Sequence, residues 1–415
     1  MKLLHTADLH LGKTLHEMSL LNVQEKMLND IHDMLTGAPY AALLIAGDVY
    51  DRAIPSAEAV SLFSRFLARI REDCPETSVF IIPGNHDSAQ RLAFAHEILQ
   101  NQRIYIAHGT AQLATPVILT QGSEKLAVFL LPFLSFGSFS EEKRAEYREA
   151  GDSQAAMAAV ASEILKKAIV PGIPSLLLAH LFTVGGKNSA SERTFIGTAE
   201  YVDPGLFSFF DYTALGHLHR CQRITDRMYY SGSPLAYSFD EADDAKCILS
   251  VNIDCASGKK SDTVNNGHIA ETPSDAEGCT APPPVSVTIE RIPILPERPL
   301  KRLEGRFAEF FTERKFDKWS GCFLEITLTD AEVISHPMQL LRRKFPFLLS
   351  IRQKSFMEET QAAGEEQLTL RERTAEDPLT LAENFNRFET VINGESRRMK
   401  QELFELLCKE TLYET

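Results

Sequence analysis

The sequence contains no long hydrophobic run, no closely paired cysteines, no fixed-period repeat and no segment typical of a secretory signal. Its longest apolar stretches have the length of β-strands, far below the roughly 20 residues that a membrane-spanning helix requires. The 7 cysteines are scattered and odd in number, which argues against a disulfide framework and against a thiolate zinc site. We therefore expect a cytoplasmic protein with reduced thiols and without a membrane partner.

An excess of basic residues is also absent. The formal net charge of −14 argues mildly against a nucleic-acid partner, because phosphate backbones favour basic surfaces. The charge is unevenly distributed, however, since residues 298–354 contain 12 Lys and Arg against 7 Asp and Glu. A pair of bound divalent cations would add local positive charge that this count omits. Net charge alone therefore leaves the substrate open.

The chain of 415 residues is longer than one ordinary domain, and residues 1–256 alternate apolar runs with helical patterns. The apolar runs are continuous, which predicts strands that are covered on both faces. We expect an α/β fold in which two stacked mixed β-sheets are flanked by helices, including helices at 20–34 and 56–70. The predicted strands are Lys2–Thr6, Ala42–Ala46, Ser78–Ile82, Leu126–Leu131, Ser175–Ala179, Tyr212–Leu215, Met228–Tyr230 and Cys247–Ile253.

The composition changes after residue 256. Residues 257–284 are polar and end in three prolines, which predicts a linker or a long surface loop. Residues 285–356 are predicted to form a small α+β domain. Its predicted strands are Val285–Ile294, Cys322–Leu328 and Phe347–Ile351, and its predicted helices lie near Pro299–Glu313 and His336–Lys344.

The C-terminal part of the chain reads as a second linker followed by a helix pair. Residues 357–378 are polar, and residues 379–415 carry two helical patterns that are interrupted by Gly394. Each helix has a stripe of Leu, Phe, Met or Ile side chains. From the sequence alone, packing on the chain's own domain and docking on another protein are equally compatible with these stripes.

Metal-ligand residue types follow five of the predicted strands. The carboxyl ends of strands in an open α/β sheet meet at one edge, so these groups are expected to converge there. Residues two apart in extended backbone point the same way, so two of the motifs can each supply a pair of ligands. The groups are Asp8-Leu9-His10, Gly47-Asp48, Gly84-Asn85-His86-Asp87, His180 and Gly216-His217-Leu218-His219.

Seven candidate ligands are enough for two adjacent metal ions that share a carboxylate. Carboxylate, carboxamide and imidazole groups suit Mn(II), with iron or zinc as alternatives, and no thiolate favours zinc. Two such ions would lower the pKa of a bridging water and orient a phosphate, which is the chemistry of phosphoester hydrolysis. The candidate metal ligands are Asp8, His10, Asp48, Asn85, His180, His217 and His219.

Each group also has a common structural interpretation. Asp-x-His and Gly-Asp after a strand are usually turns, and a single histidine such as His180 is usually a satisfied core residue. Gly84-Asn85-His86-Asp87 is more specific, because a turn needs only one of its three polar residues. The order of all five groups, each at a strand end, favours metal binding over coincidence.

In this order the motifs resemble those of the calcineurin-type metallophosphoesterase superfamily. Within it, residues 1–250 are similar to the bacterial SbcD-type nucleases, whereas the similarity beyond about residue 285 is only architectural. The supporting stretches are His5–Gly12, Ser191–Arg193, Phe195–Thr198, Tyr230–Pro234 and Ser238–Glu241.

The resemblance implies a role for each candidate residue. One metal would be held by Asp8, His10, Asp48 and His219, and the other by Asp48, Asn85, His180 and His217, with Asp48 between them. The catalytic residues would be His86, as the general acid that protonates the leaving alkoxide, and Asp51, which would orient the His86 ring. An eighth ligand or a supporting residue is the alternative role of His86. The metal implied is manganese.

The resemblance also implies partners. The substrate would be DNA, cut as an exonuclease at duplex ends and as an endonuclease on single strands and hairpins. The small domain would be a capping domain that contacts DNA. The helices at 379–412 would bind an SbcC-like SMC/ABC ATPase, and the chain would form a homodimer within that complex. Two rival hypotheses are a dimetal phosphatase or phosphodiesterase with a non-DNA substrate and a scaffold with a vestigial site.

Overall fold

The computed structural model describes residues 1–135, 137–146, 153–187, 201–254, 285–332 and 334–354. The predicted linkers at 257–284 and 357–378 and the predicted helix pair at 379–415 lie outside these residues. The chain divides into two compact units. Unit 1 consists of Met1–Arg302, Asp317–Glu325 and Phe345–Ser350, and unit 2 of Leu303–Phe316, Ile326–Lys344 and Ile351–Thr415.

Sheet 1 of unit 1 has six strands in the order β14-β13-β1-β4-β5-β6. The strands β1, β4, β5 and β6 run parallel to one another, and β13 and β14 continue the sheet in antiparallel pairing. The strands are β1 (Lys2–Thr6), β4 (Ala42–Ile45), β5 (Ser78–Ile81), β6 (Ile104–Ile106), β13 (Cys247–Ile253) and β14 (Val287–Pro293).

Sheet 2 also has six strands, in the order β11-β12-β10-β9-β8-β7. Its four central strands are parallel, and each edge strand pairs antiparallel with its neighbour. The strands are β7 (Val117–Gln121), β8 (Glu124–Leu131), β9 (Ser175–His180), β10 (Tyr212–Gly216), β11 (Gln222–Thr225) and β12 (Met228–Tyr230).

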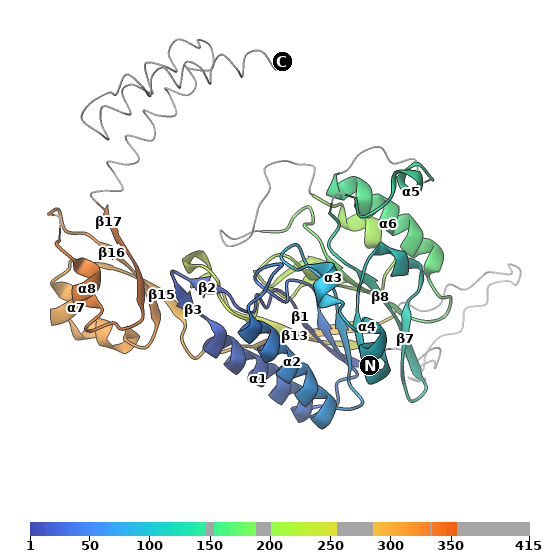
Figure 1. Cartoon of the computed structure of the whole chain (residues 1–415), viewed down its shortest axis with the longest axis horizontal. Helices are drawn as coiled ribbons and strands as arrows, with labels where there is room; N and C mark the ends of the chain where they lie inside the picture. The colour runs from blue at the N-terminus through green and yellow to red at the C-terminus, as the bar shows by residue number, and fades with distance from the viewer. Residues whose placement is uncertain (136, 147–152, 188–200, 255–284, 333, 355–415) are drawn as a thin grey trace, which may run out of the picture. The chain divides into compact units, whose positions relative to one another are not determined.

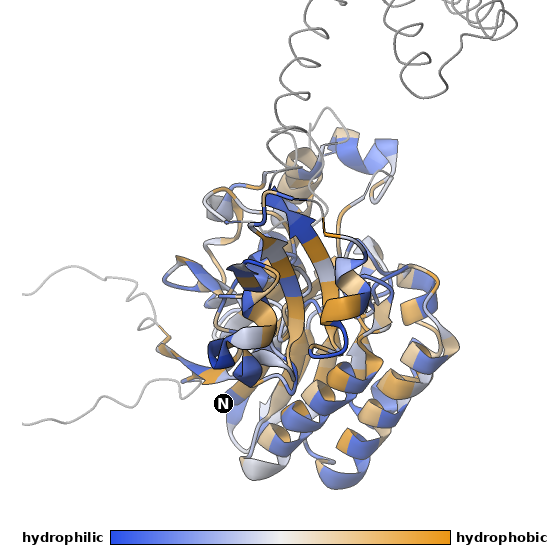
Figure 2. Ribbon diagram, turned by 90° about the vertical axis from the view of Figure 1, so that its left-hand side faces the viewer, coloured by the Kyte–Doolittle hydropathy of each residue, from blue (hydrophilic) through white to orange (hydrophobic). Residues whose placement is uncertain are grey.

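Helices cover the outer faces of the two sheets (Figure 1). The helices α1 (Leu21–Gly37) and α2 (Ala57–Asp73) pack on sheet 1, and α6 (Gln154–Ala168) packs on sheet 2. Side chains such as Leu44 and Leu178 fill the layer between the sheets. Figure 2 shows mostly apolar strands behind helices whose apolar residues alternate with polar ones. The predicted α/β sandwich is confirmed.

The carboxyl ends of the parallel strands position the site. Short helices and strands follow several of these ends. None of the described helices is long and apolar enough to cross a membrane. The β1, β4 and β5 ends in sheet 1 and the β9 and β10 ends in sheet 2 each lead into one of the five predicted groups. The short elements are β2 (Thr14–Leu15), β3 (Met18–Ser19), α3 (Ala89–Leu92), α4 (His96–Leu99) and α5 (Glu141–Glu146).

Strand β14 corrects one prediction. We assigned Val285–Ile294 to the small domain, but β14 pairs with β13 over seven residues, from Val287 opposite Ile253 to Pro293 opposite Cys247. The assignment was wrong because the polar stretch that precedes β14 was interpreted as a domain boundary. Much of the strand has exposed and half-buried residues in turn, as expected for an edge strand with one covered face.

The remaining described strands form a three-stranded sheet in the order β15-β16-β17. The helix predicted near Pro299–Glu313 was wrong in its first half, because Leu300–Gly305 is a strand, with only a short helix after it. In this strand Leu300 and Leu303 are buried between polar residues, a spacing of three that also suits a helix. The elements are β15 (Leu300–Gly305), α7 (Glu309–Thr312), β16 (Phe323–Leu328), α8 (Pro337–Leu341) and β17 (Leu348–Gln353).

Candidate metal centre

Strained backbone marks the turns that follow the strands. Asp8, His10, Asp48 and His217 have φ angles of 55°, 43°, 50° and 105°, in the left-handed region that non-glycine residues seldom adopt. Such conformations cost roughly 1–3 kcal/mol each and persist where the surroundings impose them. The turns therefore hold these four side chains in directions that an ordinary strand exit would not produce.

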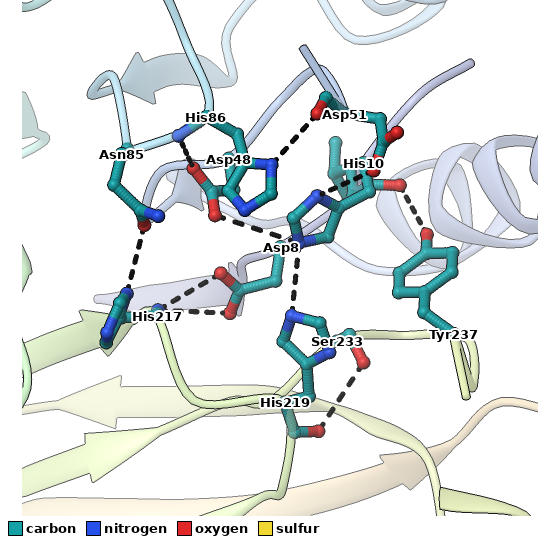
Figure 3. Close-up of polar contacts among 12 residues, drawn as sticks. Asp8, His10, Asp48, Asp51, Asn85, His86, His217, His219, Ser233 and Tyr237 are labelled. Carbon is teal, nitrogen blue, oxygen red and sulfur yellow. Dashed lines mark hydrogen bonds and ion pairs between the residues drawn. The ribbon is translucent and has the colours of Figure 1, made fainter. Parts of the chain in front are cut away.

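The first cluster lies where the ends of β1 and β10 meet. Asp8, His10 and His219 are buried, and one potential ligand atom from each lies within 4.8 Å of the others. The Nε2 atoms of His10 and His219 are 3.1 Å apart. Asp8 also accepts hydrogen bonds from the main-chain N–H of His217, at 3.0 Å and 3.2 Å, which joins the two sheets (Figure 3).

The second cluster lies beside the first and is joined to it by Asp48. Asn85 Oδ1 is 3.0 Å from both His180 Nε2 and His217 Nδ1. Asp48 Oδ2 is 3.7 Å from His180 Nε2 and also 3.7 Å from His10 Nε2 of the first cluster. The seven predicted ligands therefore form one continuous group around Asp48, in which Asn85 and His217 are half-buried and the others buried. Figure 3 labels six of them, all except His180.

Hydrogen bonds on the far side of the rings determine the tautomers. His180 Nδ1 donates to the carbonyl of Ala46 at 2.8 Å, so in the neutral ring Nε2 carries a lone pair. That lone pair faces the acceptor oxygens Asn85 Oδ1 and Asp48 Oδ2. Lone pairs that point at one another repel unless a cation lies among them. These residues therefore fit a divalent metal ion.

Burial keeps the histidines neutral. It lowers the pKa of His180 and of His217 to about 3, and it lowers the pKa of His10 well below its ordinary value, with the neighbouring His219 adding to the effect. Burial likewise raises the pKa of the Asp48 carboxyl. Neutral imidazole is the form that binds metal, so the rings are in the ligand-competent state at neutral pH.

Glycines permit the closest approaches of the backbone. A Cβ atom at Gly84 would lie 2.1 Å from Asp48 Oδ1, and one at Gly216 would lie 1.9 Å from the Ala46 carbonyl oxygen. Both distances are far below any normal contact. Only glycine at these two positions lets the β5 and β10 ends pass this close to the end of β4.

His86 sits at the edge of the group with its ring held in place. Its Nδ1 donates to the main-chain carbonyl of Asp51 at 2.9 Å, and its ring packs edge-on against His10 at 4.7 Å between centroids. The Asp51 carboxylate points elsewhere, because it accepts a hydrogen bond from Lys13 Nζ at 2.8 Å. The ring of His86 is thus oriented by the backbone at residue 51 and not by the Asp51 side chain.

Asp87 ties two of the loops together, a role that the motif alone did not reveal. Its carboxylate accepts hydrogen bonds from the main-chain N–H groups of Gly84 and Val49 at 3.0 Å and of Tyr50 at 2.9 Å. Burial and the nearby Asp48 raise its pKa to about 7. Asp87, the third polar residue of Gly84-Asn85-His86-Asp87, was visible in the sequence, but its partners are main-chain groups that no side-chain pattern identifies.

Glu241 is a second residue that sequence reasoning left without a role. It is fully buried, its Oε1 lies 3.1 Å from His219 Nδ1, and its Oε2 lies 2.5 Å from Lys246 Nζ. Burial alone would raise the pKa of this carboxyl, but the hydrogen bond with His219 and the charge of Lys246 outweigh it and lower the pKa. The carboxylate therefore stays ionised beside a predicted metal ligand.

An aromatic side chain closes the group on the side of the second cluster. Phe133 stacks on His217 at 6.3 Å and meets the edge of His180 at 6.0 Å between ring centroids. Its main-chain N–H donates to the carbonyl of Pro83 at 3.0 Å, which anchors it next to the loop that carries Asn85. Phe133 shields one side of both rings from water.

Comparison with known proteins agrees with this geometry. The model of the calcineurin-like phosphoesterases matches residues 1–221, and the SbcD_C model, described as the Type 5 capsule protein repressor C-terminal domain, matches residues 296–390. A curated relative, the SbcD component of the nuclease SbcCD from Staphylococcus epidermidis, is 29% identical over 357 residues, which cover 85% of each chain. The predicted similarity to SbcD-type proteins is confirmed.

Solved structures give more distant matches. A crystal structure of a dimetal phosphatase from Danio rerio matches with a TM-score of 0.33 and 11% identity, covering 60% of this chain and 92% of that one. The phosphoesterase model, by contrast, matches more than half of the sequence, so the chain belongs to the calcineurin-like phosphoesterase family.

Proposed function

We propose that the chain is the nuclease component of an SbcCD-type complex and hydrolyses DNA phosphodiester bonds with two divalent metal ions. The observation that carries this proposal is the pair of nitrogen and oxygen clusters that share Asp48. The proposal is also supported by the similarity to the SbcD component of the nuclease SbcCD along 85% of the chain. The activities proposed are exonuclease action on duplex ends and endonuclease action on single strands and hairpins.

The proposed metal ligands divide into two sets. The 3.7 Å distances from Asp48 Oδ2 to His10 and to His180 support a shared carboxylate. Nitrogen and oxygen donors without sulfur favour Mn(II). When bound, two such ions acidify a water molecule and neutralise charge on a phosphate. The first set is Asp8, His10, Asp48 and His219, and the second is Asp48, Asn85, His180 and His217.

His86 is proposed as the general acid. Its Nδ1 proton is engaged by the Asp51 carbonyl, so the protonated ring presents its second proton on Nε2. The ring packs against His10, and His86, His10 and Asp48 each offer a ligand atom within 4.8 Å of the others, so His86 lies next to the proposed metal ligands and its alternative role is that of an eighth ligand. From this place His86 can hold a phosphate oxygen and protonate the departing alkoxide, a contribution typically worth about 10²–10⁴ in rate.

A DNA hairpin and Mn(II) provide the test. The purified chain should cleave the hairpin and should turn over a generic aryl phosphodiester much less efficiently. The opposite preference would favour the second candidate, a phosphatase or phosphodiesterase with a non-DNA substrate, for which the net charge of −14 is the supporting observation. Absence of hydrolysis on both substrates with two metals bound would leave the scaffold hypothesis.

The proposed partner is an SbcC-like SMC/ABC ATPase. The region that would bind it, residues 379–412, lies outside the described residues, so the proposal is supported by the apolar stripes of the sequence and by the SbcD_C match at 296–390. A chain that ends at residue 378 should lose co-purification with the ATPase and keep hairpin cleavage. The excess of Lys and Arg at 298–354 supports DNA contact by the proposed capping domain.

The proposed homodimer would bury exposed apolar side chains of the nuclease domain. Phe94 and Ile98, on the segment of α3 and α4, are 81% and 69% exposed. Apolar side chains this exposed and this close together commonly mark an interface. Phe94→Glu should convert a dimer to a monomer in light scattering, whereas Leu295→Glu, at another residue that is 81% exposed, should not. Unchanged mass for Phe94→Glu would place the interface elsewhere.

A further inference from the structure

Three histidines at the proposed metal centre are each oriented by a hydrogen bond from Nδ1, but the accepting groups are of two kinds. His180 and His86 donate from Nδ1 to the main-chain carbonyls of Ala46 and Asp51. His219 instead donates from Nδ1 to a side chain, the carboxylate of Glu241, at 3.1 Å. The orientation of the His219 ring therefore depends on a residue that can be changed without altering the backbone.

The Glu241 carboxylate sits in a complete set of donors. Its Oε2 lies 2.5 Å from Lys246 Nζ and 3.4 Å from both Ser233 Oγ and the main-chain nitrogen of Tyr237. Lys246 is itself buried and also donates to the main-chain carbonyl of His219 at 3.0 Å. The pair thus holds both the ring and the backbone of His219.

Stability alone is a poor reason for such a pair. Burying two charges costs several kcal/mol in desolvation, and apolar replacements of the same shape are often as stable or more so. A carboxylate that accepts the Nδ1 proton of a metal-binding histidine, by contrast, fixes the tautomer and makes Nε2 a better donor to the metal. The Nε2 of His219 faces His10 Nε2 at 3.1 Å, inside the first cluster.

We propose that Glu241 is a positioning residue that sets the affinity of one of the two metal positions, the one formed by Asp8, His10 and His219, with Lys246 holding its charge in place. This inference rests on the proposed metal centre. The second position takes its orientation from the Ala46 carbonyl and from Asn85, so it does not depend on Glu241. The two positions therefore differ in how they can be weakened.

Glu241→Gln is the sharpest perturbation because it keeps the shape and removes the charge. An amide has one oxygen and one NH₂ group, whereas both neighbours, His219 Nδ1–H and the Lys246 ammonium, are donors. If the amide oxygen faces Lys246, the NH₂ group turns to His219 and favours the tautomer with its proton on Nε2, which cannot bind metal. If the oxygen faces His219, the NH₂ group meets the ammonium.

The experiment is a calorimetric titration of the metal-free full chain with Mn(II), without DNA. Wild type should bind two ions, and Glu241→Gln should bind one with unchanged affinity and the other about 10- to 100-fold more weakly. The matched control is Asp243→Asn, which removes a carboxylate from the same turn. The Asp243 side chain is 87% exposed, and its carboxylate accepts a hydrogen bond from Lys301 Nζ at 3.0 Å. It should bind Mn(II) like wild type.

A double-variant cycle separates positioning from a general structural role. In the His219→Ala background the first position is already lost, so adding Glu241→Gln should cause no further change in Mn(II) affinity. The proposal would be overturned if Glu241→Gln weakened Mn(II) binding equally at both positions or at neither. It would also be overturned if Glu241→Gln caused its full loss of Mn(II) affinity again in the His219→Ala background. If Glu241→Gln fails to fold by circular dichroism, Glu241→Asp, which keeps the charge but shortens the reach, is judged by the same outcomes.

Failure of this proposal and failure of the proposed function are distinguishable. The titration measures metal alone, so a chain that binds two ions but does not cut DNA would refute the nuclease assignment and leave Glu241 testable. Conversely, a chain that cuts DNA with unchanged Mn(II) binding in Glu241→Gln would refute only the positioning role.

Discussion

Replacing Gly216 by alanine adds one methyl group where the end of β10 passes close to the end of β4. The new Cβ would lie 1.9 Å from the carbonyl oxygen of Ala46, and the atoms must separate by about 1.1 Å to reach even the 3.0 Å below which real Cβ contacts essentially never fall. The same oxygen accepts the Nδ1 proton of His180 at 2.8 Å. Gly216 also pairs with His180 between β10 and β9, so the displacement is passed directly to a proposed ligand.

The size of the effect follows from this displacement. Forcing a methyl group into a filled space typically costs about 1–3 kcal/mol, which corresponds to a fall in melting temperature of roughly 2–12 °C for a unit of this size. A misplacement of about 1 Å at reacting groups can cost on the order of 10²-fold in rate. We therefore expect Gly216→Ala to fold with a lowered melting temperature and to cleave a DNA hairpin about 100-fold more slowly with Mn(II).

Gly37→Ala is the matched control. Gly37 is the last residue of α1, and a Cβ there would meet nothing within 4 Å. This variant should keep wild-type activity and should be unchanged or slightly more stable, by up to about 1 kcal/mol. The assays are thermal unfolding of the metal-free chain and single-turnover cleavage. Wild-type melting temperature and rate in Gly216→Ala would refute the close packing of β10 on β4.

Three further outcomes are expected. His86→Ala should lower DNA cleavage by at least about 100-fold and should still bind two Mn(II) ions in a titration; loss of an ion would make His86 a ligand. Asp51→Asn should retain the hydrogen bond to His86, because that bond uses a main-chain oxygen. Loss of the general-acid step in this variant would contradict the observed contact. Burial lowers the pKa of His5, His180 and His217 to about 3, so the unfolded chain binds more protons below pH 6.5, and stability should fall as the pH is lowered from 6.5 toward 3. At pH 5 each of these histidines should lower the free energy of unfolding by on the order of 2 kcal/mol relative to pH 7. Equal urea midpoints for the metal-free chain at pH 7 and pH 5 would exclude this loss of stability.

The strands of the sandwich were predictable because they are buried on both faces. Continuous apolar runs predicted β1, β12 and β13 with the bounds that the structure has, and most of the other strands to within two residues. The helix predicted at 20–34 is α1, displaced by one residue at its start and extended by three at its end. Runs of this kind leave little choice of structure, because a loop of the same composition would expose apolar side chains or bury unpaired backbone groups.

Strands with one exposed face were harder to predict. β14 follows a long polar stretch and has little continuous apolar sequence, so nothing local indicates that it returns to sheet 1. β15 has charged residues next to buried leucines and was interpreted as a helix. In both cases the deciding contact is a partner strand, β13 for β14 and β16 for β15, and the pairing is not encoded in the residues of the strand itself.

The types of the candidate ligands were visible in the sequence, whereas their supporting contacts were not. Positions such as Asp8 and His180 follow predicted strands and could be named from that alone. The contact to His86 comes from a main-chain oxygen, which any residue at position 51 would offer. Glu241 reaches His219 from a separate turn, 22 residues further along the chain, and no spacing rule predicts that meeting.

Asp8 and His217, which share a hydrogen bond, are 209 positions apart in the chain. A nascent polypeptide therefore carries Asp8, His10 and Asp48 long before the ribosome has made the histidines of the second sheet. The complete set of proposed metal ligands comes together only after both sheets have been synthesised and packed on each other. Synthesis that stops before residue 217 would yield a product that lacks His217 and His219 and therefore the complete proposed centre.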